Sequence, residues 1–326
     1  MMPDIVINIE VSLRRNYQDL RFCPQDNAED LRESRHRSLS VLQAIYPKGK
    51  VLGNALEYAS ELSYLQGALL PADYHKINHA ALFYDRHTDI IAAINMDDHL
   101  VLKAQGGLEQ LDHLQQVVRE AEQAMAQAGL VFAQDADFGY LSYRPTMSGS
   151  GLFINAILHL PMLHYLKQIR SLGEMLKTQE YLLRPLAVHD KRNPAKMYVL
   201  SNATSLNRGD GVLVQRIREF VDLLSQREAL LREKALTRNG QSAFADQVWR
   251  SYGILRFARR LNDGDFLNHW SNLRLGSLAG ILPLSIETVD SLLVYSGNQV
   301  FLKEGADTKN IVGLRAQNVR QALSGG

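Results

Sequence analysis

The residues with the clearest chemical potential form the stretch Asn95-Met96-Asp97-Asp98-His99, which follows a run of apolar residues. It places an amide, two carboxylates and an imidazole directly after a predicted strand. Because loops at the ends of rigid strands carry many binding sites, this arrangement favours a site for a charged substrate. Asn95, Asp97, Asp98 and His99 are therefore the first candidate site residues.

The overall composition limits the partners of such a site. The chain has 326 residues, of which 46% are hydrophobic, and its 36 basic and 35 acidic residues give a net charge of +1. This length is enough for two domains. Without a basic excess we expect no nucleic-acid partner, and without an apolar run near the ~20 residues of a membrane span we expect no membrane partner. The single cysteine, Cys23, excludes an internal disulfide and fits a reducing, cytoplasmic location.

A metal site is not expected either. The sequence has no Cys and His spacing typical of zinc, and His75 and His79 lie four residues apart without an evident third ligand. We interpret this pair as solvated or partly buried histidines.

The hydrophobic periodicity assigns these residues to elements. Alternation of apolar residues over 4–13 predicts a strand, and helical spacing over 108–125 predicts a long amphipathic helix. Two apolar runs, 80–84 and 89–94, predict a hairpin. Further strands are expected over 101–104, 139–143, 153–160 and 196–200, and further helices over 56–70, from Pro161 onward and over 212–235.

A boundary signal over residues 237–240, with the letters TRNG, separates two parts of the chain. Strands and helices mix before it, whereas the pattern after it is helical without a long strand. We therefore expect an α+β domain over residues 1–235 and a smaller all-helical domain over residues 236–326.

Several segments, in order, resemble the guanidino phosphotransferases, which comprise phosphagen kinases and bacterial protein-arginine kinases. The stretch 95–99 resembles the family's Asn-Glu-Glu-Asp-His signature. Other similar segments are Phe138–Thr146, Gly149–Leu152, Leu158–Pro161 and Leu200–Asn202, and, for the extra helical domain of protein-arginine kinases, Arg250–Leu255 and Leu273–Gly276. The resemblance implies an antiparallel sheet flanked by helices, a smaller C-terminal all-helical domain, and ATP-dependent phosphorylation of a guanidinium group.

In this family arginines hold the ATP phosphates, and the aligned positions here have mostly lost them. Glu10 and Ser12 stand where the first strand carries two arginines, and Val101 and Phe153 stand at two later arginine positions. Each lost charge-assisted contact removes about 1.5–3 kcal/mol of binding free energy. The resemblance therefore implies a nucleotide site that is degenerate.

Three other arginines lie close to these positions in the sequence. Arg144 occupies the position of the family's active-site cysteine, and Arg14 and Arg15 end the first strand. With a changed register they could hold phosphate in place of the lost arginines. Otherwise Arg14 and Arg15 are solvated residues at a strand end.

The catalytic acids are also altered. Asp97 and Asp210 align with two catalytic glutamates, and each is shorter by one methylene, on the order of 1 Å. A misplacement of that size can cost around a hundredfold in rate. Asn95, Asp98 and His99 then either belong to a working site or persist as a hydrogen-bonded turn that stabilises the fold, and we favour the turn.

Two further family motifs are incomplete. The family's Gly-Glu-Gly segment aligns with residues 188–190, which read VHD. Its phosphoarginine-binding Arg-Asp-x-x-Arg-Ala motif aligns with residues 311–316, which read IVGLRA. Arg315 thus remains as a remnant of that pocket, and we expect it to be an interface or helix-surface residue.

The sequence therefore favours a pseudokinase with little or no ATP binding and no cofactor. The alternative is a divergent but active protein-arginine phosphotransferase that uses Asp97 and Asp210, with ATP and Mg²⁺ as cofactors. A third possibility is a pocket for a different cationic ligand.

The expected partner is a second copy of the chain. The C-terminal domain carries apolar stripes, and a domain of under ~90 residues buries only a modest core alone. The related family also dimerises through this domain. An active paralogue or a protein-quality-control factor are further expected partners, by family analogy alone.

Overall fold

The computed structural model describes residues 4–22, 27–53, 62, 69, 78–186, 193–237, 241–296, 301 and 310–324. The expected helix over 56–70 lies almost wholly outside the described residues. Cys23, His75 and the segment 188–190 lie outside them as well.

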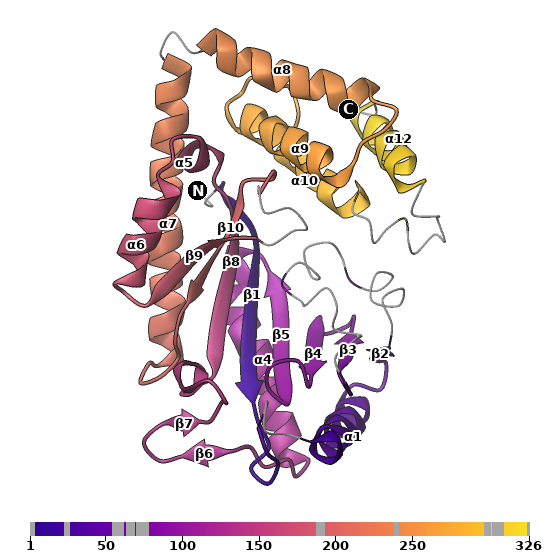
Figure 1. Cartoon of the computed structure of the whole chain (residues 1–326), viewed down its shortest axis with the longest axis vertical. Helices are drawn as coiled ribbons and strands as arrows, with labels where there is room; N and C mark the ends of the chain where they lie inside the picture. Colours follow the sequence, from indigo (N-terminus) through magenta and orange to yellow (C-terminus); the bar gives the residue numbers. More distant parts are fainter. Residues whose placement is uncertain are drawn as a thin grey trace.

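An eight-stranded antiparallel sheet forms the centre of the first part, with the order β2-β3-β4-β5-β1-β8-β10-β9 (Figure 1). Its strands are β1 (Val6–Arg15), β2 (Lys50–Leu52), β3 (Ala81–Asp85), β4 (Ile90–Ile94), β5 (Leu100–Gly106), β8 (Leu152–His159), β9 (Tyr181–Pro185) and β10 (Met197–Asn202). The long strand β1 lies between β5 and β8. Its side chains point alternately to the two faces of the sheet.

The alternation along β1 gives the sheet two different faces. Ile9, Val11 and Leu13 are fully buried in the main hydrophobic core. Helices α4 (Leu111–Gln127) and α7 (Asp210–Thr237) share that core, as does α1 (Ala28–Ile45). Because successive residues of a strand point to opposite faces, Glu10, Ser12 and Arg14 lie on the other side.

The C-terminal helices gather at one end of the sheet (Figure 1). They are α8 (Gln241–Phe257), α9 (Asp263–Leu278), α10 (Ile286–Ser296) and α12 (Ile311–Ser324). A second core joins them to the sheet: Ile157 and Val199 pack in one cluster with Trp270 and Leu273. Since Ile157 shares a face with Asn155, which pairs with Glu10, these helices cover one end of the face that carries Glu10.

The expected fold class, an antiparallel sheet flanked by helices with a helical C-terminal part, is confirmed. The strands β2 and β9 were not predicted, and two of the predicted elements differ in extent. The strand expected over 139–143 is only β7 (Gly139–Tyr140), paired with β6 (Gln134–Asp135). The helix expected after Pro161 is split into α5 (Pro161–Tyr165) and α6 (Ile169–Lys177), because Lys167 adopts a positive φ of 55° between them.

No helix in the described part of the chain is both long and apolar enough to cross a membrane.

Candidate functional site

The four positions of the lost arginines lie together on the face of the sheet opposite α4 and α7. In the pairing register, Ser12 lies opposite Phe153 of β8, and Arg14 lies opposite Val101 of β5. Glu10 lies two residues before Ser12, on the same face. Residues that pair across strands share a face. The structure therefore brings Glu10, Ser12, Val101 and Phe153 into one surface.

Glu10 is the centre of a buried polar network on this surface. Glu10 is 1% exposed. Nζ of Lys103 lies 3.3 Å from Oε1 of Glu10 and 3.2 Å from Oε2. Nδ2 of Asn155 donates to Oε1 at 3.1 Å, and Nε2 of Gln105 donates to Oε2 at 3.0 Å. The carboxylate is thus paired and hydrogen-bonded on both oxygens, as a buried charge requires.

Arg14 is the cation nearest to the acidic turn. Its Nη1 donates to Oδ2 of Asp97 at 3.3 Å and to Oδ2 of Asp98 at 3.1 Å. Its guanidinium carbon lies 5.6 Å from the centre of the Phe153 ring. Phe153 and Val101 are buried, so apolar side chains fill two of the four positions. Arg14 is therefore engaged rather than solvated.

Asn95 and His99 close a tight turn. Asn95 has a positive φ of 54°, and its backbone N–H donates to the carbonyl of His99 at 3.1 Å. Its side chain accepts from Oγ of Ser34 at 2.8 Å. Nδ1 of His99 accepts the backbone N–H of Tyr17 at 3.1 Å, which leaves the proton on Nε2 to donate to the carbonyl of Arg21 at 3.2 Å. These contacts support the hydrogen-bonded turn that the sequence favoured.

Asp98 belongs to the same turn and is buried. Its Oδ1 accepts from Nδ2 of Asn16 and from Oγ of Ser142, each at 2.7 Å. Asp97 points outward, with 49% of its side chain exposed. Of the two acids, only Asp97 is open to solvent.

Arg15 lies on the opposite face of β1, next to α4. It is fully buried, pairs with Glu122, and its guanidinium carbon lies 3.4 Å from the centre of the Tyr140 ring. Burial lowers the pKa of Arg15 against the opposing attraction of Glu122. The expectation of a solvated strand-end arginine is therefore wrong for Arg15, and the structure does not bring it to the face of Ser12 and Phe153.

Asp210 is also held on the helix-covered side. It begins α7, and its Oδ2 accepts from Nε of Arg119 at 2.9 Å and from Nη2 at 2.6 Å. Arg119 in turn donates to Glu122 at 2.8 Å. The structure thus does not bring Asp210 together with Asp97, which contacts Arg14 on the other face.

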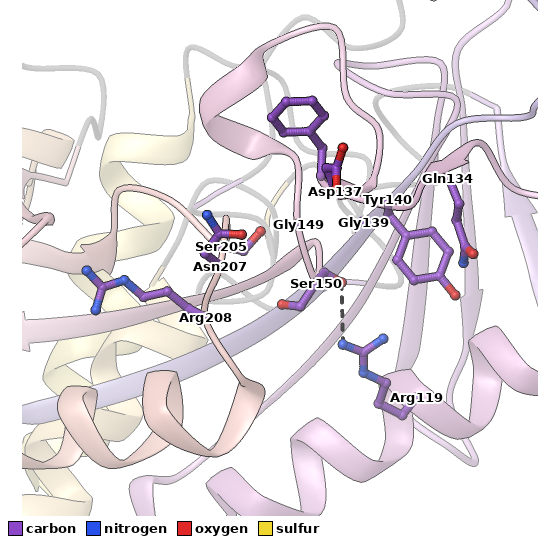
Figure 2. Close-up of a pocket in the computed structure, with 11 residues that line it drawn as sticks. Arg119, Gln134, Asp137, Gly139, Tyr140, Gly149, Ser150, Ser205, Asn207 and Arg208 are labelled. Carbon is purple, nitrogen blue, oxygen red and sulfur yellow. Dashed lines mark hydrogen bonds between the residues drawn. The ribbon is translucent and has the colours of Figure 1, made fainter.

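Arg119 lines a cavity of about 540 Å³ between the hairpin β6–β7 and the loop before α7 (Figure 2). Figure 2 shows its hydrogen bond to the carbonyl of Ser150, at 3.4 Å. Arg208, at the other side of the cavity, pairs with Glu180. Arg119 and Arg208 are each paired with an acidic side chain, so neither of them offers an unpaired guanidinium to an anion in the cavity.

Arg144 is exposed and donates to the hydroxyl of Tyr143. This hydrogen bond raises the pKa of Arg144, and the negative charges of Asp97 and Asp98 raise it further. Arg144 therefore lies within electrostatic reach of the acidic turn.

Arg315 is 1% exposed, so it is not the helix-surface residue that the sequence suggested. Its Nε donates to the carbonyl of Ser296 at 2.9 Å and its Nη1 to the carbonyl of Leu261 at 2.8 Å. Nη2 lies 3.4 Å from Oδ1 of Asp263. Its guanidinium holds the ends of other helices together inside the C-terminal part.

Sequence reasoning missed Lys103, the partner of Glu10. A signal existed, because Lys103 is the charged residue of an apolar strand and lies two positions after Val101. It also missed Arg119 and Glu122. These two residues lie on one face of the helix α4, so they do not interrupt an apolar strand as Lys103 does. In the described part of the chain, no group of three or more His, Cys, Asp or Glu side chains is arranged to hold a metal ion.

Comparison with known proteins places the chain in a family. The model of the ATP:guanido phosphotransferase C-terminal catalytic domain matches residues 47–231, and that of the protein-arginine kinase McsB C-terminal domain matches residues 241–325. A protein-arginine kinase of Clostridium botulinum (strain Eklund 17B / Type B) is 27% identical over 331 residues, which cover 98% of this chain and 96% of the relative. One of Exiguobacterium sp. (strain ATCC BAA-1283 / AT1b) is 26% identical over 283 residues, or 86% and 80% of the two chains.

Solved structures of the same fold are more distant in sequence. The duplicated taurocyamine kinase from Schistosoma mansoni is similar with a TM-score of 0.59 at 17% identity, covering 76% of this chain and 37% of that one. A lombricine kinase is similar with a TM-score of 0.55 at 17% identity, covering 72% and 69%. With the sheet, the acidic turn and both domain matches in agreement, the chain belongs to the ATP:guanido phosphotransferase family.

Proposed function

We propose that this chain is a pseudokinase of the protein-arginine kinase group, which binds or regulates a partner and binds ATP weakly or not at all. The observation that carries the proposal is the Glu10–Lys103 network. A carboxylate lies at a position where the family resemblance implies a phosphate-binding arginine, and the nearby lysine is already used to neutralise it. A phosphate there meets a paired ion and the buried ring of Phe153.

Arg14, another cation on this face, supports the same proposal. Arg14 is bound by Asp97 and Asp98. A nucleotide would have to break this contact and compete with two carboxylates for one guanidinium. Each such exchange removes most of the gain of the new charge-assisted hydrogen bond.

Titration calorimetry with ATP and ADP, each with Mg²⁺, tests the proposal. We expect no binding tighter than about 1 mM. The Clostridium botulinum relative, measured in the same buffer, is the positive control for the ligand and the instrument. A dissociation constant near the micromolar range for this chain contradicts the proposal.

Catalysis is tested separately, by incubation with ATP, Mg²⁺ and an arginine-containing protein, followed by mass spectrometry. Phosphorylated arginine in the product would establish the divergent active kinase instead. Arg184 of β9 is exposed and lies opposite Val199 of β10. It is then the first residue to replace in a search for the arginines that hold the phosphates of ATP.

The partners and the compartment are also proposals. We propose a homodimer, with an active paralogue or a protein-quality-control factor as further partners, by analogy with the family alone. The cytoplasm is the proposed compartment because a single cysteine fits a reducing environment.

A further inference from the structure

A buried lysine connects the sheet to the C-terminal helices. Lys196, directly before β10, is 4% exposed, and its Nζ donates to Oδ1 of Asn268 on α9 at 2.6 Å. The ring of Tyr165 on α5 lies 5.5 Å from the same Nζ. In the described part of the chain no carboxylate offsets this charge, and burial lowers the pKa of Lys196 to about 8. Buried charges in proteins are normally paired, so this ammonium is an exception.

Two histidines near Lys196 add basic groups to the junction rather than acids. His164 belongs to α5 and His269 to α9. Burial lowers the pKa of both imidazoles, and the positive charge of Lys196 also lowers it. Asp265 acts in the opposite direction on His269. Basic groups from α5, α9 and the start of β10 therefore lie close enough together to affect one another's charge.

These three side chains keep hydrogen-bonding capacity for a ligand. Nδ1 of His164 lies 2.6 Å from the hydroxyl of Tyr198, and Nδ1 of His269 lies 3.1 Å from Oγ of Ser251. Among the described residues only Nδ1 of each ring is hydrogen-bonded, so both Nε2 atoms remain available. An ammonium has several N–H donors, and Lys196 uses one of them here.

The junction is reachable from solvent and separate from the positions where the family holds phosphate. His164 and His269 are half-buried, and Tyr165 is 40% exposed. None of Lys196, His164 and His269 aligns with the arginines of the nucleotide site or with the phosphoarginine motif. Arg315, the remnant of that motif, is buried and bonded to other carbonyl groups. The junction therefore presents basic groups that neither motif accounts for.

We propose that Lys196, His164 and His269 form a site for an oxyanion, the phosphate or carboxylate group of a small molecule, at the junction between the sheet and the C-terminal helices. An anion there supplies the negative charge that buried Lys196 lacks, and its oxygens accept from the ammonium and from the Nε2–H groups. Because it contacts α5, α9 and the start of β10 together, the bound anion joins the two parts of the chain more firmly.

Nuclear magnetic resonance of the unmodified chain near neutral pH tests the site directly. Inorganic phosphate and acetate are the separate probes, and sodium chloride at equal ionic strength is the control. We expect at least one probe to shift the ring-proton signals of both His164 and His269, with a dissociation constant of about 1 mM or tighter. Spectra of His164→Gln and His269→Gln assign the two signals. The more tightly bound probe identifies the group, and the absence of a saturable shift with both probes overturns the proposal.

The variant Lys196→Met removes the buried charge and keeps a long side chain. It should weaken binding of the preferred probe at least about tenfold in calorimetry. Lys177→Met, the same change at the exposed end of α6, is the matched control and should bind as the unmodified chain does. Undiminished binding by Lys196→Met overturns the proposal.

The two measurements also separate this inference from the proposed function. Phosphate that binds on the face of Glu10 and Phe153 would still bind to Lys196→Met and would leave the signals of His164 and His269 unchanged. Should Lys196→Met fail to fold by circular dichroism, the histidine titration of the unmodified chain decides the matter alone. Because no nucleotide is present, the result is independent of whether the chain is a pseudokinase.

Discussion

Glu10 and Lys103 form a buried ion pair on the face of the sheet that carries the positions of the lost arginines. Removing one partner of a buried ion pair is strongly unfavourable, because the other charge is left without compensation. The network around Glu10 also includes Asn155 and Gln105, so the carboxylate is held by two neighbouring strands, β5 and β8. A reversion to the arginine that the family resemblance implies at this position therefore cannot be a single step.

The first residue-scale prediction concerns this reversion. Glu10→Arg should lower the free energy of unfolding by about 3–5 kcal/mol, because it places a second cation beside buried Lys103. The double variant Glu10→Arg with Lys103→Glu should recover most of that loss. Urea unfolding of the two variants and the parent measures both effects. Equal stability of the single and double variants would show that the pair is not coupled.

A nucleotide-binding repair must therefore begin from that double variant. Adding arginine at positions 12, 101 and 153 should then improve ATP binding, as measured by calorimetry, because each arginine restores a charge-assisted contact of about 1.5–3 kcal/mol. If the repaired chain binds ATP no better than the parent, loss of the arginines is not what disables the site.

At this scale the resemblance predicted that a set of positions belongs to one site, but not what their side chains contact. Glu10, Ser12, Val101 and Phe153 were identified from the resemblance, and the strand register brings them together. Lys103 is 93 positions away from Glu10 along the chain, and their contact depends on the register of β1 against β5. Periodicity limits the register between two strands to shifts of an even number of residues, but it does not choose among those shifts.

The helix α7 is the element that connects the two ends of the first part. Asp210 at its start binds Arg119 of α4. Further along, Glu228 accepts the backbone N–H groups of Met162 at 2.6 Å and Leu163 at 3.0 Å, at the start of α5. The sequence predicted this helix from its spacing, but neither contact, because both join residues far apart in the chain. The short helices after Pro161 were likewise merged, since a break at Lys167 has no glycine or proline to mark it.

The element-scale prediction follows from Glu228. Burial raises its pKa from 4.5 to about 7, although the two backbone hydrogen bonds oppose the shift. The folded chain then binds more protons at Glu228 than the unfolded chain between pH 4.5 and 7. The free energy of unfolding should therefore fall as pH rises through this window, by up to about 3 kcal/mol.

Urea unfolding from pH 5 to pH 8 measures this slope, and Glu228→Gln should flatten it. Glu233→Gln, an equal change of charge at an exposed position of α7, is the matched control and should leave the slope in place. A Glu228→Gln chain with the parent's slope would assign the pH dependence to another group. Absolute stability is not the readout here, because a glutamine offers one oxygen to two backbone amides.

At the scale of the whole molecule, the C-terminal helices and the sheet share a core. Ile157, Met197 and Val199 from the sheet pack with Leu255 and Leu273 of the helices. Part of the apolar stripes that suggested a dimer are thus covered within the chain, and a truncation near residue 235 would expose the sheet rather than test for a dimer. The sequence could locate the stripes but not divide them between an internal and an external surface, because both use the same residue types.

The last prediction is that the remaining apolar surface of α8 forms a homodimer. Ile254 and Phe257, which are 42% and 70% exposed, line an outward groove on α8 with Gly253 and Ala258. Static light scattering of the unmodified chain at micromolar concentration should give about twice its mass of 36.7 kDa. Ile254→Lys with Phe257→Glu should give a monomer, because two charges cannot be buried unpaired in the contact. Leu223→Lys with Leu230→Glu makes the same change on the exposed face of α7 and should remain dimeric. A monomeric parent contradicts the dimer, and a parent and an α8 variant that are both dimeric locate the interface elsewhere.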